Sequence, residues 1–524
     1  MSNAVRPRAD LATPQPDEPA AGLLPAESEP ADRSRQRVFH GPSGLVAWLL
    51  IAIAAVGMLV STPQSAGPDE PVQAATAWYL SGHGLPPDST GSFSIPASLW
   101  VVPCYAFHPE VNAGCMPPRS TNPGTVTVST SKVVDYPPPY YWVVGVGQRL
   151  AALAGNEYAD IGGRLASLSL NLLVLLLLSF YMRRSHPLWG SFLLLVSTPM
   201  AIFMGIVVNP SGWEITCGLV MAAALSEAAW SHRSIGADPW PRTTTVVLVL
   251  ASLGLCTARP IGFVWAAGLT VSAVALAPTI NRRMLLRLAI AVAPGIAVGM
   301  LWLVAHRTID SGTSATGSMS VTQFIRAFAD SLMYFPNRLS PMFGALGWQD
   351  TVMPGLLLLL NIAAWSALLT RLPSIGRAAI ACGVFGVVIL PSVIETAGWA
   401  AWPLWWQGRY TMPFALGFVL LLLLRSGRLI PLAVSIVSGI SVLSVGLMVL
   451  VNAVRYGYGL DGYGLPVTLS NPGLSYARLG ISAAVAALLL LVSGYLLLQA
   501  SRTRRDLSGE GQPAGLPLPS SEAS

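Results

Sequence analysis

The sequence LVAWLLIAIAAVGMLV, residues 45–60, carries no charged side chain and no proline, and STPQSAGPDEP follows it directly as residues 61–71. An uninterrupted apolar run of this kind approaches the ~20 residues that a helix needs to cross the hydrocarbon core of a bilayer. Comparable runs recur along the chain as far as Gln499. The first run and its repeats therefore indicate a polytopic membrane protein.

The composition of the whole chain agrees with this interpretation. Of the 524 residues, 53% are hydrophobic and only 10% are charged, whereas an average soluble domain carries about 25% charged residues. So few charged side chains cannot cover the surface of a soluble globule of this size. The composition thus excludes a soluble enzyme, and equally a disordered or fibrous protein.

The apolar runs predict an all-α fold with about twelve transmembrane helices. We expect spans at residues 45–60, 165–182, 188–208, 213–230, 243–257, 260–277, 285–305, 352–369, 378–396, 410–424, 429–451 and 479–499.

Arginines between these runs indicate the topology. With the N-terminus in the cytoplasm, every second loop is cytoplasmic, short and basic, as the positive-inside rule requires. These loops carry Arg183, Arg184, Arg233, Arg242, Arg282, Arg283, Arg371, Arg377, Arg425, Arg428, Arg502, Arg504 and Arg505. We therefore expect a multi-pass protein of the cell membrane with both termini in the cytoplasm. The net charge of +6 is then a topology signal, and no nucleic-acid partner is expected.

The expected organisation is one transmembrane domain, residues 43–500, between disordered cytoplasmic tails at residues 1–42 and 501–524. The first tail has almost no bulky apolar side chains with which to build a core. Two long loops, residues 61–164 and 306–351, fall on the extracytoplasmic side.

Two segments of these outer loops are expected to lie at the membrane surface. Residues 140–153 are apolar, but counting them as a span would place the arginine clusters outside, so an interfacial or re-entrant helix is predicted. In residues 321–332, apolar side chains recur at helical spacing, which predicts an amphipathic helix on the outer leaflet.

The five cysteines include one pair in a single exported loop, Cys104 and Cys115. Oxidising conditions outside the cytoplasm let disulfides persist, so we expect these two to pair, with two free thiols as the alternative. The other cysteines lie in apolar runs, where a thiol behaves as a small hydrophobic side chain. The spacing matches no zinc-site pattern.

The most informative polar segment is Pro68-Asp69-Glu70-Pro71, just beyond the first run. Pro71 favours the start of a helix, and the helix dipole stabilises an anion there. Asp69 and Glu70 can therefore cap that helix, which is the common role of acidic residues at a helix start. The functional alternative is a carboxylate pair acting as general base or metal ligand at the outer surface.

Cations and aromatic rings fall on the same face of the expected topology. Arg259 lies in a very short outer loop and Arg409 opens an outer helix end. Each can bind phosphate, but pairing of Arg259 with Glu214 or Asp69, or snorkelling of Arg409, is at least as common. Candidate substrate contacts beside them are Tyr136, Trp348, Asp350 and Tyr410.

Four motifs occur in one order: Pro68-Asp69-Glu70-Pro71, Tyr136-Pro137-Pro138, Gly347-Trp348-Gln349-Asp350-Thr351 and Gly408-Arg409-Tyr410. In that order the chain resembles, over residues 45–500, a large family of bacterial polytopic proteins. That family is catalogued as a domain of unknown function and is related to GT-C glycosyltransferases. The resemblance implies a GT-C-like architecture and sugar transfer from a polyprenyl-phosphate donor at the extracytoplasmic face. It also implies that Asp69 or Glu70 is the base.

The expected function is therefore a membrane glycosyltransferase that moves a sugar to a cell-wall or glycolipid acceptor. Arg259 and Arg409, or a divalent metal ion, would hold the departing phosphate. The alternatives are a multi-pass transporter or lipid flippase, and an inactive envelope-assembly scaffold. A transporter would show ionisable residues and discontinuous helices at the bilayer midplane.

Overall fold

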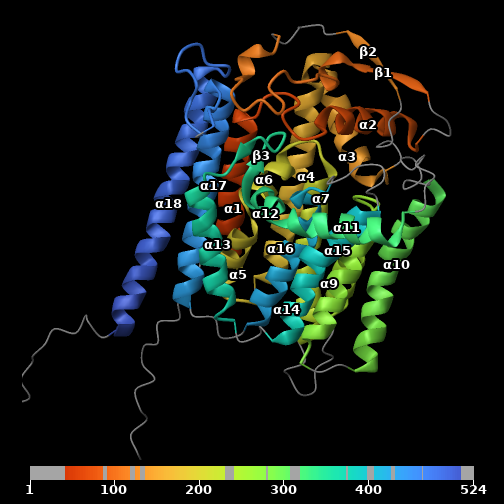
Figure 1. Ribbon diagram of the computed structural model, residues 1–524, viewed down its shortest axis with the longest axis vertical. Coiled ribbons are helices and arrows are strands. Elements are labelled where there is room, and N and C mark those ends of the chain that lie inside the picture. Colours follow the sequence, from red (N-terminus) through yellow and green to blue (C-terminus); the bar gives the residue numbers. More distant parts are fainter. Residues whose placement is uncertain are drawn as a thin grey trace, which may run out of the picture. The chain divides into compact units, whose positions relative to one another are not determined.

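The computed structural model describes residues 42–86, 91–117, 124–129, 136–183, 185–230, 241–278, 281–306, 319–372, 376–397, 406–426, 431–462 and 464–508 (Figure 1). All of them belong to the compact unit His40–Ser524. The tail predicted for residues 1–42 lies outside the described residues except for Pro42, and the tail predicted from residue 501 is described to Ser508, where it is helical.

The described residues are mainly helical. The helices are α1 (Gly44–Ser61), α2 (Glu70–His83), α3 (Pro139–Ala152), α4 (Ala159–Met182), α5 (Trp189–Val196), α6 (Pro199–Ile206), α7 (Pro210–Trp230), α8 (Arg242–Cys256), α9 (Gly262–Leu276), α10 (Arg282–His306), α11 (Val321–Met333), α12 (Phe335–Gly344), α13 (Gly355–Leu369), α14 (Arg377–Val384), α15 (Leu390–Ala397), α16 (Gly408–Arg425), α17 (Pro431–Tyr458) and α18 (Tyr476–Ser508). Two short antiparallel pairs accompany them: β1 (Ser92–Pro96) with β2 (Thr125–Ser129), and β3 (Ala345–Leu346) with β4 (Thr351–Val352).

Each predicted apolar run contains helix, which agrees with a polytopic helical membrane protein. Within the described ranges, seven helical stretches are long and apolar enough to cross a membrane, or eight if the bent pair α5–α6 is one span. Helices α8, α9 and α13 are apolar but shorter. The count of twelve spans and the orientation of the termini stay predictions.

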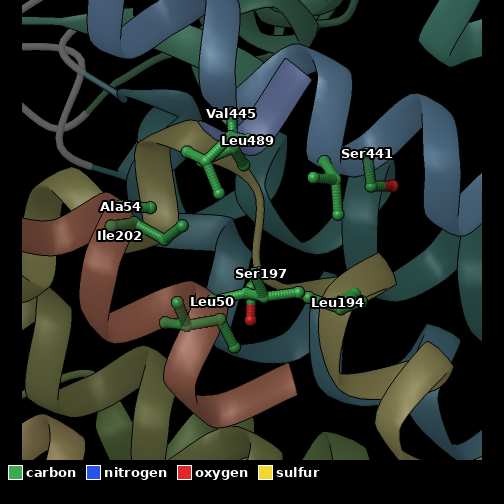
Figure 2. A pocket seen from close by; sticks show the side chains of 10 residues that line it. Leu50, Ala54, Leu194, Ser197, Ile202, Ser441, Val445 and Leu489 are labelled. Carbon is green, nitrogen blue, oxygen red and sulfur yellow. The ribbon is translucent and has the colours of Figure 1, made fainter. Parts of the chain in front are cut away.

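The run 188–208 is not one continuous helix, because α5 and α6 meet at an angle of 76°. Pro199 occupies the first turn of α6, and Thr198 caps that helix by accepting a hydrogen bond from the Ala201 backbone N–H at 3.2 Å. Proline is favoured in the first turn of a helix, so Pro199 is well suited to begin a new helix there. A cavity of about 10 Å³ lies beside the break (Figure 2). It is lined by Ser197, by Ser441 of α17 and by apolar side chains of α1, α5, α6, α17 and α18.

The first long loop, which the arginine pattern predicts to be outside, contains α2, the β1–β2 pair and α3, and these elements lie together at one end of the helices (Figure 1). Helix α3 corresponds to the predicted interfacial segment. It packs closely on α2, because a Cβ added at Gly145 would lie 2.1 Å from the Ala77 carbonyl oxygen. Buried Tyr140, Tyr141 and Val144 join α2 side chains in one apolar core. This packing fixes α2, and with it the Asp69-Glu70 segment.

The predicted amphipathic helix is present as α11, and it begins with a capping box between Ser320 and Gln323. Val321 and Ile325 are exposed, while Ala327 and Ser331 are buried. The helix therefore packs through one face and leaves apolar side chains on the other.

Candidate functional site

Asp69 stands at the junction between the turn that follows α1 and the start of α2. Its backbone is left-handed, with φ 60°, and its side chain makes no capping hydrogen bond to α2. The side chain is 47% exposed, so the carboxylate is accessible at the surface of the protein. A left-handed conformation is costly for a non-glycine residue and persists where the surroundings impose it. The simple capping role considered for Asp69 therefore has no hydrogen bond behind it.

Glu70 is buried and hydrogen-bonded on both carboxylate oxygens. Arg164 of α4 donates from Nε to Oε1 at 2.7 Å and from Nη2 to Oε2 at 2.6 Å. The backbone N–H groups of Gly67 and Val208 donate to the same carboxylate at 2.8 and 3.1 Å. These four donors occupy the acceptor positions of the carboxylate, so Glu70 cannot also accept a proton from a substrate. Its hydrogen bonds instead connect the turn before α2 to α4 and to the end of α6.

Arg409 is the cation that reaches Asp69. Its Nη2 donates to Asp69 Oδ2 at 2.6 Å and to Tyr410 Oη at 3.2 Å. The guanidinium is fully buried, and its Nε and Nη1 have no hydrogen-bond partner. Gly408 permits this position, because a Cβ there would lie 2.2 Å from the Arg338 carbonyl oxygen. Buried donors without partners are rare, and they indicate capacity for an additional acceptor.

Tyr410 separates Arg409 from a second buried arginine, Arg259. The Cζ atoms of Arg259 and Arg409 lie 4.7 and 5.1 Å from the centre of the tyrosine ring. These distances fit cation–π contacts. The Tyr410 ring thus contacts both guanidinium groups, and that of Arg409 also contacts Asp69.

Arg259 is further positioned from α7. Its Nη2 donates to Asn209 Oδ1 at 3.0 Å, and its Nε lies 3.9 Å from Glu214 Oε2 without a hydrogen bond. Of the two partners considered from the sequence, Arg259 thus faces Glu214, while Asp69 pairs with Arg409. Asn209 also donates from Nδ2 to the Pro68 carbonyl at 2.9 Å, which ties Arg259 to the residue before Asp69.

Tyr136 belongs to the same region. Burial raises the pKa of its hydroxyl, and the charges that act on it include Arg259, Asp69 and Glu214. The phenol therefore stays protonated at neutral pH and can donate a hydrogen bond. Asp135, before it, lies outside the part of the chain that is described.

Trp348 and Asp350 form a separate cluster. Asp350 Oδ2 accepts hydrogen bonds from Arg455 Nη2 at 3.2 Å and from the Phe107 backbone N–H at 3.1 Å. Trp348 Nε1 donates to the Ser65 carbonyl at 3.0 Å. Of the predicted substrate contacts, Tyr410 contacts Arg409, the partner of Asp69, and Tyr136 lies where the charges of Asp69 and Arg259 act on it. Trp348 and Asp350 instead hold backbone segments together.

Another buried ion pair joins Glu395 to Arg338. Glu395 of α15 accepts from Arg338, from Ser331 Oγ at 2.5 Å and from the Trp406 backbone N–H at 2.7 Å. It connects α11, α12 and α15 to the start of the Trp406–Tyr410 segment.

Three arginines of these clusters, Arg164, Arg338 and Arg455, were not singled out from the sequence. Arg164 and Arg455 adjoin apolar runs, and a buried charge at such a place usually has a partner or a function. Their position beside apolar runs is the sequence feature that indicates a role for these two arginines.

Cys104 and Cys115 are joined as a disulfide, with Cα atoms 6.2 Å apart. Whether the bond forms in the cell stays a prediction. Across the described ranges, no group of three or more His, Cys, Asp or Glu side chains could hold a metal ion. Arg409 and Arg259 supply positive charge at this site.

One comparison with known proteins gives a match. A family model described as "Predicted membrane protein (DUF2142)" matches residues 52–418, well over half of the chain. No curated protein and no solved structure matches.

Proposed function

The chain belongs to the DUF2142 family of predicted membrane proteins, and from that premise we propose that it is a membrane glycosyltransferase with a GT-C-like architecture. It moves a sugar from a polyprenyl-phosphate donor to a cell-wall or glycolipid acceptor at the extracytoplasmic face. The observation that carries the proposal is the contact between the half-exposed carboxylate of Asp69 and the buried guanidinium of Arg409.

Asp69 is the general base in this proposal, and Glu70 is not, because its oxygens are already occupied by Arg164 and two backbone N–H groups. The acceptor hydroxyl attacks the anomeric carbon, and its proton passes to the Asp69 carboxylate. The bond between the anomeric carbon and the phosphate oxygen breaks at the same time. The electron pair leaves with the polyprenyl phosphate.

Arg409 and Arg259 receive the negative charge of the departing phosphate. Arg409 has two nitrogen atoms without hydrogen-bond partners, Nε and Nη1, and Arg259 has one, Nε. A phosphate oxygen would satisfy these donors, which are otherwise buried unpaired. Tyr410 keeps both guanidinium groups in place before the donor arrives. Such preorganised charge is the largest single contribution in many enzymes.

The transporter alternative has one observation in its favour, the break between α5 and α6. Its prediction of ionisable residues at a discontinuous helix is not met there. The cavities of about 10 and 40 Å³ beside the break are lined by apolar or uncharged polar side chains, including Ser197, Asn171 and Thr216. The positions of the charged residues therefore favour an enzyme over a transporter. The experiment below distinguishes an active enzyme from an inactive scaffold.

The test incubates the purified full-length protein with radiolabelled polyprenyl-phosphate sugars and envelope acceptors. We expect transfer by the wild type and a loss of at least about a hundredfold in Asp69→Asn, because the amide keeps the shape but cannot take the proton. Asp330→Asn, on the exposed face of α11, is the matched control and should transfer at the wild-type rate. Wild-type transfer by Asp69→Asn would remove Asp69 from the reaction. No transfer by any variant with any donor would favour the scaffold.

A further inference from the structure

We propose that the loop closed by Cys104 and Cys115, together with Arg455, is a clamp that positions Asp69. We call residues 104–115 with Arg455 the loop clamp. Its catalytic consequence rests on the proposed function, whereas its effect on the Asp69 turn rests on contacts alone.

Arg455 is the centre of the loop clamp. It lies in the last turn of α17 and is fully buried. Its Nη1 donates to the Val111 carbonyl at 2.6 Å, and its Nη2 donates to the carbonyls of Tyr105 and His108, both at 2.9 Å. One side chain thus gathers three carbonyls of a loop whose ends are joined by the disulfide. A guanidinium is suited to this role because it presents several donors in a fixed plane.

The loop clamp contacts the turn that leads to Asp69 directly. Tyr105 Oη donates to the Gln64 carbonyl, and its ring is fully buried. Asp350, which also binds Arg455, belongs to the β3–β4 turn, and Trp348 of that turn donates to the Ser65 carbonyl at 3.0 Å. The carbonyls of two consecutive turn residues are therefore held by the loop clamp and its neighbour.

The turn needs such support because two of its residues, Ser65 and Asp69, have left-handed backbones with φ 60°. Residues in such conformations keep them only where surrounding contacts determine the backbone. Arg164 and Asn209 hold other carbonyls of this turn from α4 and from the end of α6. The loop clamp and its neighbour bind the carbonyls of Gln64 and Ser65. Loss of these contacts should therefore increase the mobility of the segment just before Asp69.

The experiment measures hydrogen–deuterium exchange of peptides covering residues 62–73 in the full-length protein in detergent. Tyr105→Phe removes one hydroxyl and keeps the ring, so the fold should survive. Exchange in the turn should become about fivefold faster, the effect of losing one buried hydrogen bond. Reduction of the disulfide should act in the same direction. The matched control is Tyr181→Phe, which removes the hydroxyl that meets Thr244 Oγ1 at 2.9 Å elsewhere and should leave this exchange unchanged.

Unchanged exchange in both the Tyr105→Phe protein and the reduced protein would overturn the loop clamp. Where transfer is measurable, Tyr105→Phe should lower kcat about fivefold and leave the donor KM unchanged, because Arg409 and Arg259 are untouched. A larger KM with unchanged kcat would contradict a positioning role. Absence of transfer in the wild type refutes the proposed function alone, since the exchange measurement still decides the loop clamp.

Discussion

At the scale of single residues, neighbouring carboxylates of one motif have different environments. Asp69 is half-exposed and contacts one arginine, whereas Glu70 is buried under four donors. Burial decides how each responds to substitution, because a charge left unpaired in the interior costs far more than one that water can solvate.

We therefore expect Glu70→Gln to lower the free energy of unfolding by about 3–5 kcal/mol, since it leaves the Arg164 guanidinium buried without its counter-charge. Asp69→Asn should cost less, about 1–2 kcal/mol, because its side chain is half-exposed and the amide oxygen can still accept the hydrogen bond of the buried Arg409. Denaturant titration of the detergent-solubilised variants measures both. Equal losses in the two variants would contradict the division between a structural and an accessible carboxylate.

Arg409→Lys tests the cation of the same pair. Lysine keeps the positive charge but has neither the flat fork nor the cation–π geometry over Tyr410. We expect kcat/KM for the polyprenyl-phosphate donor to fall by roughly a hundredfold while membrane insertion persists. Arg283→Lys, in an exposed position in the first turn of α10, serves as the control. Full activity of Arg409→Lys would show that only net charge matters at this position.

At the scale of elements, the long first loop is organised by links that are distant in sequence. The disulfide closes residues 104–115, and Arg455 brings that loop to the end of α17. Gly145 lets α3 approach α2 backbone to backbone. These links turn a connection of roughly a hundred residues into a packed layer that carries Asp69.

Removal of the disulfide should weaken this layer. In the chain-entropy model, closing so short a loop contributes roughly 3 kcal/mol, so the Cys104→Ser/Cys115→Ser variant should unfold at lower denaturant concentration. Mass spectrometry of a non-reduced digest decides whether the bond exists in the native membrane. Alkylated Cys104 and Cys115 peptides without any crosslinked species would refute the pairing.

At the scale of the whole molecule, the family match and the apolar helices agree on a membrane protein, and the arginine distribution predicts its orientation. A reporter fused near Arg283 should signal the cytoplasm, and one near Asp330 should signal the outside. A reporter near Arg428, a residue outside the described ranges, should also signal the cytoplasm. An external signal at Arg283 would invert the topology and place the Asp69 site on the cytoplasmic face.

The sequence by itself determined the features that depend on neighbouring residues. Apolar runs specify helices because burial of their side chains requires internal hydrogen bonding of the backbone. Helix α11 followed from spacing alone, and the start of α2 beside Pro71 followed from the chemistry of helix ends.

The tertiary structure decided which charges meet. Asp69 and Arg409 are 340 positions apart, Glu70 and Arg164 are 94 apart, and Asp350 and Arg455 are 105 apart. Residue type shows that a buried arginine needs an acceptor, but several carboxylates satisfy that need equally well. Only the packing of α2, α4, α16 and α17 brings one particular oxygen within reach of each guanidinium, and so separates the accessible Asp69 from the structural Glu70.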